Sequence, residues 1–99
     1  MANNREKEIV QAVVNILAEV LSPSRIILFG SRAKGNNEQH ADFDFAVDIP
    51  RPDISMERKI KDEVEKASGL YKVDIIYLDD VDEDFKNIVL GTGKVIYER

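Results

Sequence analysis

The feature that most constrains this chain is a short segment in which aspartates alternate with large apolar residues, Asp42-Phe43-Asp44-Phe45. Side chains on a β-strand point alternately to opposite faces, so the segment predicts a strand with both aspartates on one face, about 7 Å apart. The phenylalanines on the other face then pack into a hydrophobic core. The strand therefore presents carboxylates on one side and is anchored by apolar packing on the other.

A turn of small residues precedes this strand. The apolar run 25–29 ends at Gly30, and Ser31 follows. If Ser31 opens a helical turn, backbone N–H groups and its hydroxyl point toward an anion, and Arg32 and Lys34 add positive charge nearby. Carboxylate oxygens are ligands of Mg²⁺, which usually also retains water and substrate phosphate. The two elements predict a site for a metal-bound nucleoside triphosphate. In the simpler alternative, Ser31 only caps a helical turn and the two basic residues are surface charges.

A third carboxylate lies in the later apolar run 73–78. Aspartate is disfavoured within strands, so Asp74 in this run is a candidate for the same site. Simpler interpretations stay open at this level. Asp42 and Asp44 could be solvated acids on an edge strand, and Asp74 could be a strand-end acid paired with Lys72.

Two other nucleotide or metal motifs fail on spacing. Gly30 and Gly35 have the glycine spacing of a Walker loop, but Asn36-Asn37 stands where Lys-Ser/Thr is required. An EF-hand loop is excluded because its glycine is absent and large apolar residues separate the aspartates. Neither a P-loop nor a calcium loop is therefore predicted.

The composition limits the classes of protein that remain. A chain of 99 residues suits one domain, residues 1–99, and the absence of cysteine with a single histidine leaves only oxygen-bound metal as an expectation. The formal net charge of -5 disfavours a binder of long nucleic acid. No apolar run approaches the roughly 20 residues that span a bilayer, and the polar start shows no signal peptide. The expectation is a cytoplasmic protein without membrane contact.

The pattern of apolar residues and breakers predicts an α/β (α+β) domain. We expect helices at about 5–21, from Asp53 or Ser55 to Ser68, and at 83–90 ended by Gly91, with strands at about 25–29, 42–48, 72–78 and 94–97. A crossover helix between the second and third strands favours a mixed four-stranded sheet, with helices on one face and the site on the other. Asp74 should then lie beside Asp42 and Asp44. The pattern does not indicate which element covers Ile76 and Leu78, which lie on the same face of the strand as Asp74.

These elements together resemble the signature of the DNA polymerase beta-like nucleotidyltransferase superfamily and, more narrowly, the minimal nucleotidyltransferases. The resemblance extends over nearly the whole chain and is carried by Gly30-Ser31, Ala33, Gly35, Asp42-x-Asp44, Asp74 and the closing strand near Gly93–Tyr97. The family typically has a serine directly before the first aspartate, where this chain has Ala41.

The resemblance implies an enzyme with the polymerase beta-like nucleotidyltransferase fold that moves a nucleoside monophosphate, AMP from ATP, onto a hydroxyl of a partner with two Mg²⁺ ions. It assigns catalysis and metal binding to Asp42, Asp44 and Asp74, and nucleotide binding to Gly30, Ser31, Arg32 and Lys34. The implied partner is a small helical HEPN toxin modified on a tyrosine, which makes this chain an antitoxin. The alternative is a non-catalytic module that binds nucleotide or partner and neutralises a toxin by contact. Base preference, acceptor and homo-oligomerisation stay open.

Overall fold

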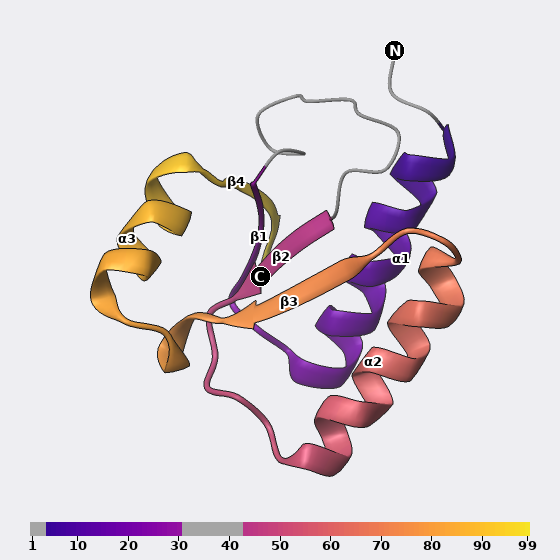
Figure 1. Ribbon diagram of the computed structural model, residues 1–99, viewed down its shortest axis with the longest axis horizontal. Helices are drawn as coiled ribbons and strands as arrows, with labels where there is room; N and C mark the ends of the chain where they lie inside the picture. The colour runs from indigo at the N-terminus through magenta and orange to yellow at the C-terminus, as the bar shows by residue number, and fades with distance from the viewer. Residues whose placement is uncertain (1–3, 31–42) are drawn as a thin grey trace.

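The computed structural model describes residues 4–30 and 43–99. Within these two ranges, three helices, four strands and one short 3₁₀ turn follow one another, and Figure 1 shows their arrangement. Their bounds are α1 (Asn4–Leu21), β1 (Arg25–Phe29), β2 (Phe43–Val47), α2 (Ile54–Ser68), β3 (Val73–Tyr77), η1 (Leu78–Asp80), α3 (Glu83–Thr92) and β4 (Lys94–Glu98). The predicted elements are confirmed with bounds shifted by one or two residues, while η1 was not predicted.

The four strands form one mixed sheet in the order β3-β2-β1-β4. β1 pairs antiparallel with both β2 and β4, whereas β2 and β3 are parallel. Parallel neighbours cannot be joined by a tight turn, and α2 supplies the crossover between them. The predicted mixed four-stranded sheet is therefore confirmed.

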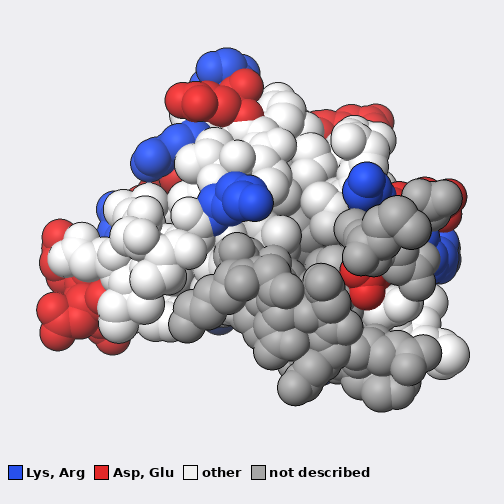
Figure 2. All heavy atoms as spheres, turned by 90° about the horizontal axis from the view of Figure 1, so that it is seen from above, with Lys and Arg blue, Asp and Glu red and all other residues white. Residues whose placement is uncertain are grey.

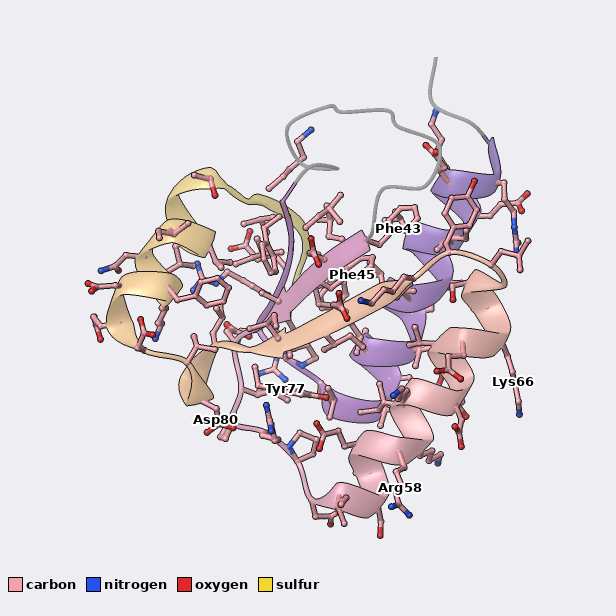
Figure 3. The ribbon with its side chains drawn as sticks, in the orientation of Figure 1. Phe43, Phe45, Arg58, Lys66, Tyr77 and Asp80 are labelled. Atoms are coloured by element: carbon pink, nitrogen blue, oxygen red, sulfur yellow. The ribbon has the colours of Figure 1, made fainter. Side chains whose placement is uncertain are left out.

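Helices α1 and α2 cover one face of the sheet, where the main core lies (Figure 1). The apolar stripe of α1 repeats at helical spacing and faces the apolar side of β2. Figure 3 shows Phe43 and Phe45 on this side, between β2 and α1. The core side chains that are almost completely buried include Ile9, Val13, Leu17, Ile26, Phe43, Phe45, Val47 and Ile60. The predicted split of β2 into an apolar and an acidic face holds for the residues described.

Helix α3 packs on the opposite face and forms a second, smaller core with Ile27, Ala46, Leu78 and Val89. The sequence predicted all helices on one face of the sheet, and this prediction is wrong for α3. The physical reason lies in β1, whose continuous apolar run has side chains on both faces that must leave water. Ile76 packs against the same cluster, so α3 also provides the cover that the sequence left unassigned.

Aspartates begin the second and third helices. The side chain of Asp53 accepts a hydrogen bond from the Met56 N–H at 2.8 Å, and Asp82 accepts one from the Phe85 N–H at 2.8 Å. Each therefore satisfies a backbone donor that the first helical turn leaves free. Asp53 was one of the two residues predicted to begin α2.

The end of α3 differs from the prediction. Gly91 was expected to stop the helix, but α3 continues to Thr92 and the N–H of Gly93 donates to the Val89 carbonyl at 2.8 Å. Space decides between the two glycines. A Cβ at Gly91 would meet nothing within 4 Å, whereas one at Gly93 would collide with Ile27 and the Val89 carbonyl. A glycine inside a helix costs only about 1 kcal/mol, which packing against the sheet outweighs.

Phe45→Ala should destabilise the fold by about 3–5 kcal/mol, because a fully buried aromatic ring is lost and a cavity remains. Urea unfolding measures the change. Leu70→Ala is the matched control, since Leu70 is fully exposed and its loss should change the free energy of unfolding by less than about 0.5 kcal/mol. Equal effects of the two substitutions would contradict this assignment of the core.

Candidate active site

The register of β2 against β3 brings two of the predicted acids together. Asp44 is the partner of Asp74 in the parallel pair, and register partners on neighbouring strands lie about 4.8 Å apart with side chains on the same face. That face is opposite to the one on which Phe43 and Phe45 enter the main core. Two carboxylates from distant parts of the chain are thus adjacent at one end of the sheet.

The turn after β1 lies against the same carboxylate. Gly30 has a φ of 76°, and a Cβ built on it would lie 2.5 Å from an Oδ2 atom of Asp44. The contact follows from the antiparallel pairing of β1 with β2, in which Phe29 is the partner of Asp44. Glycine is required at this position for two reasons: a residue with a side chain would be strained at this φ, and its Cβ would displace the Asp44 carboxylate.

An apolar wall flanks the two acids. Phe29 and Phe85 make an edge-to-face contact with ring centroids 6.1 Å apart on the α3 side of the sheet. Phe29 also neighbours Asp44 across the strands, which places an aromatic ring beside the carboxylate. Sequence reasoning did not assign Phe29 to the site. The available signal was its position as the last apolar residue before the Gly30 turn.

The other predicted site residues, Ser31, Arg32, Lys34 and Asp42, lie outside the described residues. Within residues 4–30 and 43–99, no group of three or more acidic, histidine or cysteine side chains could hold a metal ion. The described part of the site is the pair Asp44 and Asp74 next to Gly30. Both carboxylates are only half-buried and offer the hard oxygen donors that Mg²⁺ accepts, so this pair fits a divalent cation.

The opposite end of β3 carries a buried phenol. Tyr77 is 3% exposed, and the Arg51 guanidinium lies 5.9 Å from the centre of its ring (Figure 3). Burial raises the pKa of Tyr77, Glu57 raises it further, and Arg51 acts in the opposite direction. Arg51 is itself held by Glu57 at 3.8 Å and by its backbone N–H to Asp80 at 2.6 Å. Tyr77 and Glu57 line one hollow together with Asp74, so this cluster and that acid border the same hollow.

Residues 11–99 match the family model described as polymerase beta, nucleotidyltransferase. The chain belongs to this nucleotidyltransferase family. The predicted resemblance to the polymerase beta-like nucleotidyltransferases is therefore confirmed. Within the described ranges, no helix is long and apolar enough to cross a membrane.

One curated relative and two solved structures are similar to this chain. A Haemophilus influenzae protein named probable protein adenylyltransferase MntA is 28% identical over 90 residues, covering 89% of this chain and 79% of that protein. A crystal structure of a toxin-antitoxin with AMP-PNP matches with a TM-score of 0.75 at 22% identity, over 90% of this chain and 73% of the other. A tri-AMPylated Shewanella oneidensis HEPN toxin in complex with MNT antitoxin matches with a TM-score of 0.70 at 18% identity, over 96% and 73%. The two structures establish the shared fold.

We predict that Gly30→Ala displaces the Asp44 carboxylate and destabilises the protein by about 1–3 kcal/mol, because of the collision and the positive φ. Urea unfolding measures the loss of stability.

Gly91→Ala provides the control, because Gly91 lies in a helix with open space around it and alanine should add about 0.5–1 kcal/mol of stability. A Gly30→Ala variant as stable as the wild type would contradict the predicted collision with the Asp44 carboxylate.

The raised pKa of Tyr77 predicts a stability loss at alkaline pH. The neutral phenol is favoured in the folded state, so its contribution is complete below the ordinary tyrosine pKa of about 10 and is lost as the pH rises through the higher folded-state value. We expect wild-type protein to lose more stability than Tyr77→Phe between pH 9 and pH 11.5 in urea unfolding. Parallel losses in the two proteins would show that Tyr77 does not cause the dependence.

Proposed function

We propose that this nucleotidyltransferase moves AMP from ATP onto a hydroxyl group of a protein partner in the cytoplasm. The observation that carries the proposal is the in-register pair Asp44 and Asp74 beside Gly30, in a chain of this family. The relative named as a protein adenylyltransferase supports the choice of a protein acceptor. The fold match to a toxin-antitoxin structure with AMP-PNP is consistent with an adenine nucleotide.

The proposed roles follow the chemistry of each side chain. Asp42 and Asp44 would hold two Mg²⁺ ions with help from Asp74, and the Gly30-Ser31 backbone and the Ser31 hydroxyl would bind the terminal phosphates. When bound, such ions neutralise charge on the attacking and leaving oxygens of an in-line displacement.

The remaining residues orient the reactants and handle the proton. Arg32 and Lys34 would add charge to the phosphate site. Asp74, on the outer strand of the pair, would hold the acceptor hydroxyl and take its proton as the oxygen attacks the α-phosphorus and pyrophosphate leaves. The rigid strand pairing keeps both carboxylates in place without further reorganisation.

The partner we propose is a small helical HEPN toxin, which is modified on a tyrosine, so that this chain acts as an antitoxin. The fold match to an MNT antitoxin in complex with a tri-AMPylated HEPN toxin supports this choice. The formal net charge of -5 is consistent with a protein acceptor, since a binder of long nucleic acid needs a basic surface.

The test is co-expression with a HEPN protein encoded by a neighbouring reading frame, followed by intact-mass measurement of that protein. We predict that wild type adds the mass of one or more AMP groups, and that Asp44→Asn and Asp74→Asn lower the modified fraction by at least about 100-fold, because a ligand charge and a proton acceptor are lost. Asp62→Asn, an exposed acid on α2, should retain full transfer.

Complex formation without any gain of mass would reject transfer and favour neutralisation by contact alone. Circular dichroism of each variant checks that the fold is intact. Full transfer by Asp44→Asn would remove the basis of the proposed mechanism.

A further inference from the structure

A groove runs along the outer edge of β3, between this strand and α2. β3 is the last strand in the described sheet, so one of its two sides has no strand partner there. Two hollows of about 410 and 190 Å³ lie along it, and both are lined by Lys61, Val73 and Asp74. The two hollows share these three residues, one of which is a proposed catalytic acid, and are together called the groove along β3.

The backbone of β3 turns hydrogen-bonding groups toward this groove. The Phe43 N–H donates to the Lys72 carbonyl at 3.0 Å, which fixes Lys72 as facing β2. Backbone groups of successive strand residues point to opposite sides, so those of Val73 and Ile75 point away from β2. Val73 lines both hollows and Ile75 lines the smaller one. An extended peptide can therefore pair with this edge as an added strand.

Strand geometry would separate the side chains of such a peptide. The residue opposite Asp74 would project onto the face that carries Asp44 and Asp74. Its two neighbours would project to the other face, toward α2, where Tyr71 lines the groove. The same docking thus brings one side chain to the acids and places the flanking ones against apolar surface.

The surroundings of the groove favour a peptide over a polyanion. Its lysines, Lys61 and Lys72, are balanced by Glu57 and Glu65. Leu70, between two residues that line the larger hollow, is fully exposed. The face shown in Figure 2 also carries basic and acidic side chains near one another among the described residues, with no continuous basic stripe. Nucleic acid would need such a stripe, whereas an extended segment with apolar residues beside its hydroxyl residue suits this lining.

We propose that the groove along β3 binds an extended segment of the acceptor protein as an added β-strand, with the residue to be modified opposite Asp74 and an apolar contact at Leu70. This inference rests on the proposed function and specifies how its acceptor reaches the site. The segment contains a tyrosine, serine or threonine with apolar residues on both sides.

The test is a titration of ¹⁵N-labelled protein with a synthetic ten-residue peptide that has a central tyrosine between valines. We expect the amide signals of Val73 and Ile75 to shift. In one copy of the peptide, N-methyl groups replace the backbone N–H hydrogens that face β3. This copy should bind at least tenfold more weakly, because its side chains are unchanged and only the strand pairing is blocked. The copy methylated on the other side should bind as the parent does.

Two variants with matched chemistry locate the contact. Leu70→Asp should weaken binding at least threefold, whereas Ile88→Asp, an exposed apolar residue on α3, should leave it unchanged. Both side chains are largely in solvent, so the fold should tolerate either change. Equal effects of the two would reject a contact at Leu70.

The inference would be overturned if the peptide did not bind at millimolar concentration, or if both methylated copies bound equally. It would also be overturned if only amide signals of other strands shifted. Displacement of the peptide by a short RNA oligonucleotide that itself shifts the amide signals of Val73 and Ile75 would likewise reject it. Binding needs no catalysis, so the result is distinct from that of the mass experiment. Peptide that binds the edge but is never modified would reject the proposed transfer, and peptide modified without edge binding would reject the groove.

Discussion

The parallel, in-register pairing of β2 with β3 is the constraint on which the rest of the site depends. It is held by the apolar face of the pair, where Phe43 lies opposite Val73 and Phe45 opposite Ile75, all packed in the main core. A slip by one residue would turn every β3 side chain to the other face and expose its apolar set. The hydrophobic core therefore fixes the position of Asp74 against Asp44 although neither acid belongs to it.

The two faces of the sheet have different roles: one face packs into the main core, and the other carries the acids of the proposed site. α1 and α2 cover one face, whereas α3 covers part of the other with Phe85 and Val89. The acids lie on this second face, at the end of the sheet where Gly30 follows β1. The ring of Phe29 belongs to the α3 core and lies beside Asp44, so apolar packing borders the proposed site on one side. On the other side lies β3, the outermost strand of the sheet within residues 4–30 and 43–99. Its outer edge is the side from which we propose that the acceptor arrives.

The sequence predicted the elements well where local physics is decisive. The apolar stripe of α1, the unalternating run of β1 and the alternating β2 each specify their own structure, and Asp53 and Gly69 mark the ends of α2. It was wrong about the end of α3, because the choice between Gly91 and Gly93 depends on contacts with Ile27 of another strand. It also placed all helices on one face, since periodicity shows that a helix has a buried side but not which sheet face that side meets.

The sequence by itself determined the family, the fold class and the identity of the candidate acids, because glycine after an apolar run and aspartates within strands are local signals that packing does not change. Only the tertiary structure decided that Asp44 stands opposite Asp74, that Gly30 lies against the Asp44 carboxylate and that the outer side of β3 is open along α2. These facts depend on strand order, direction and register, which arise from burial of side chains distant in sequence and therefore have no local signature.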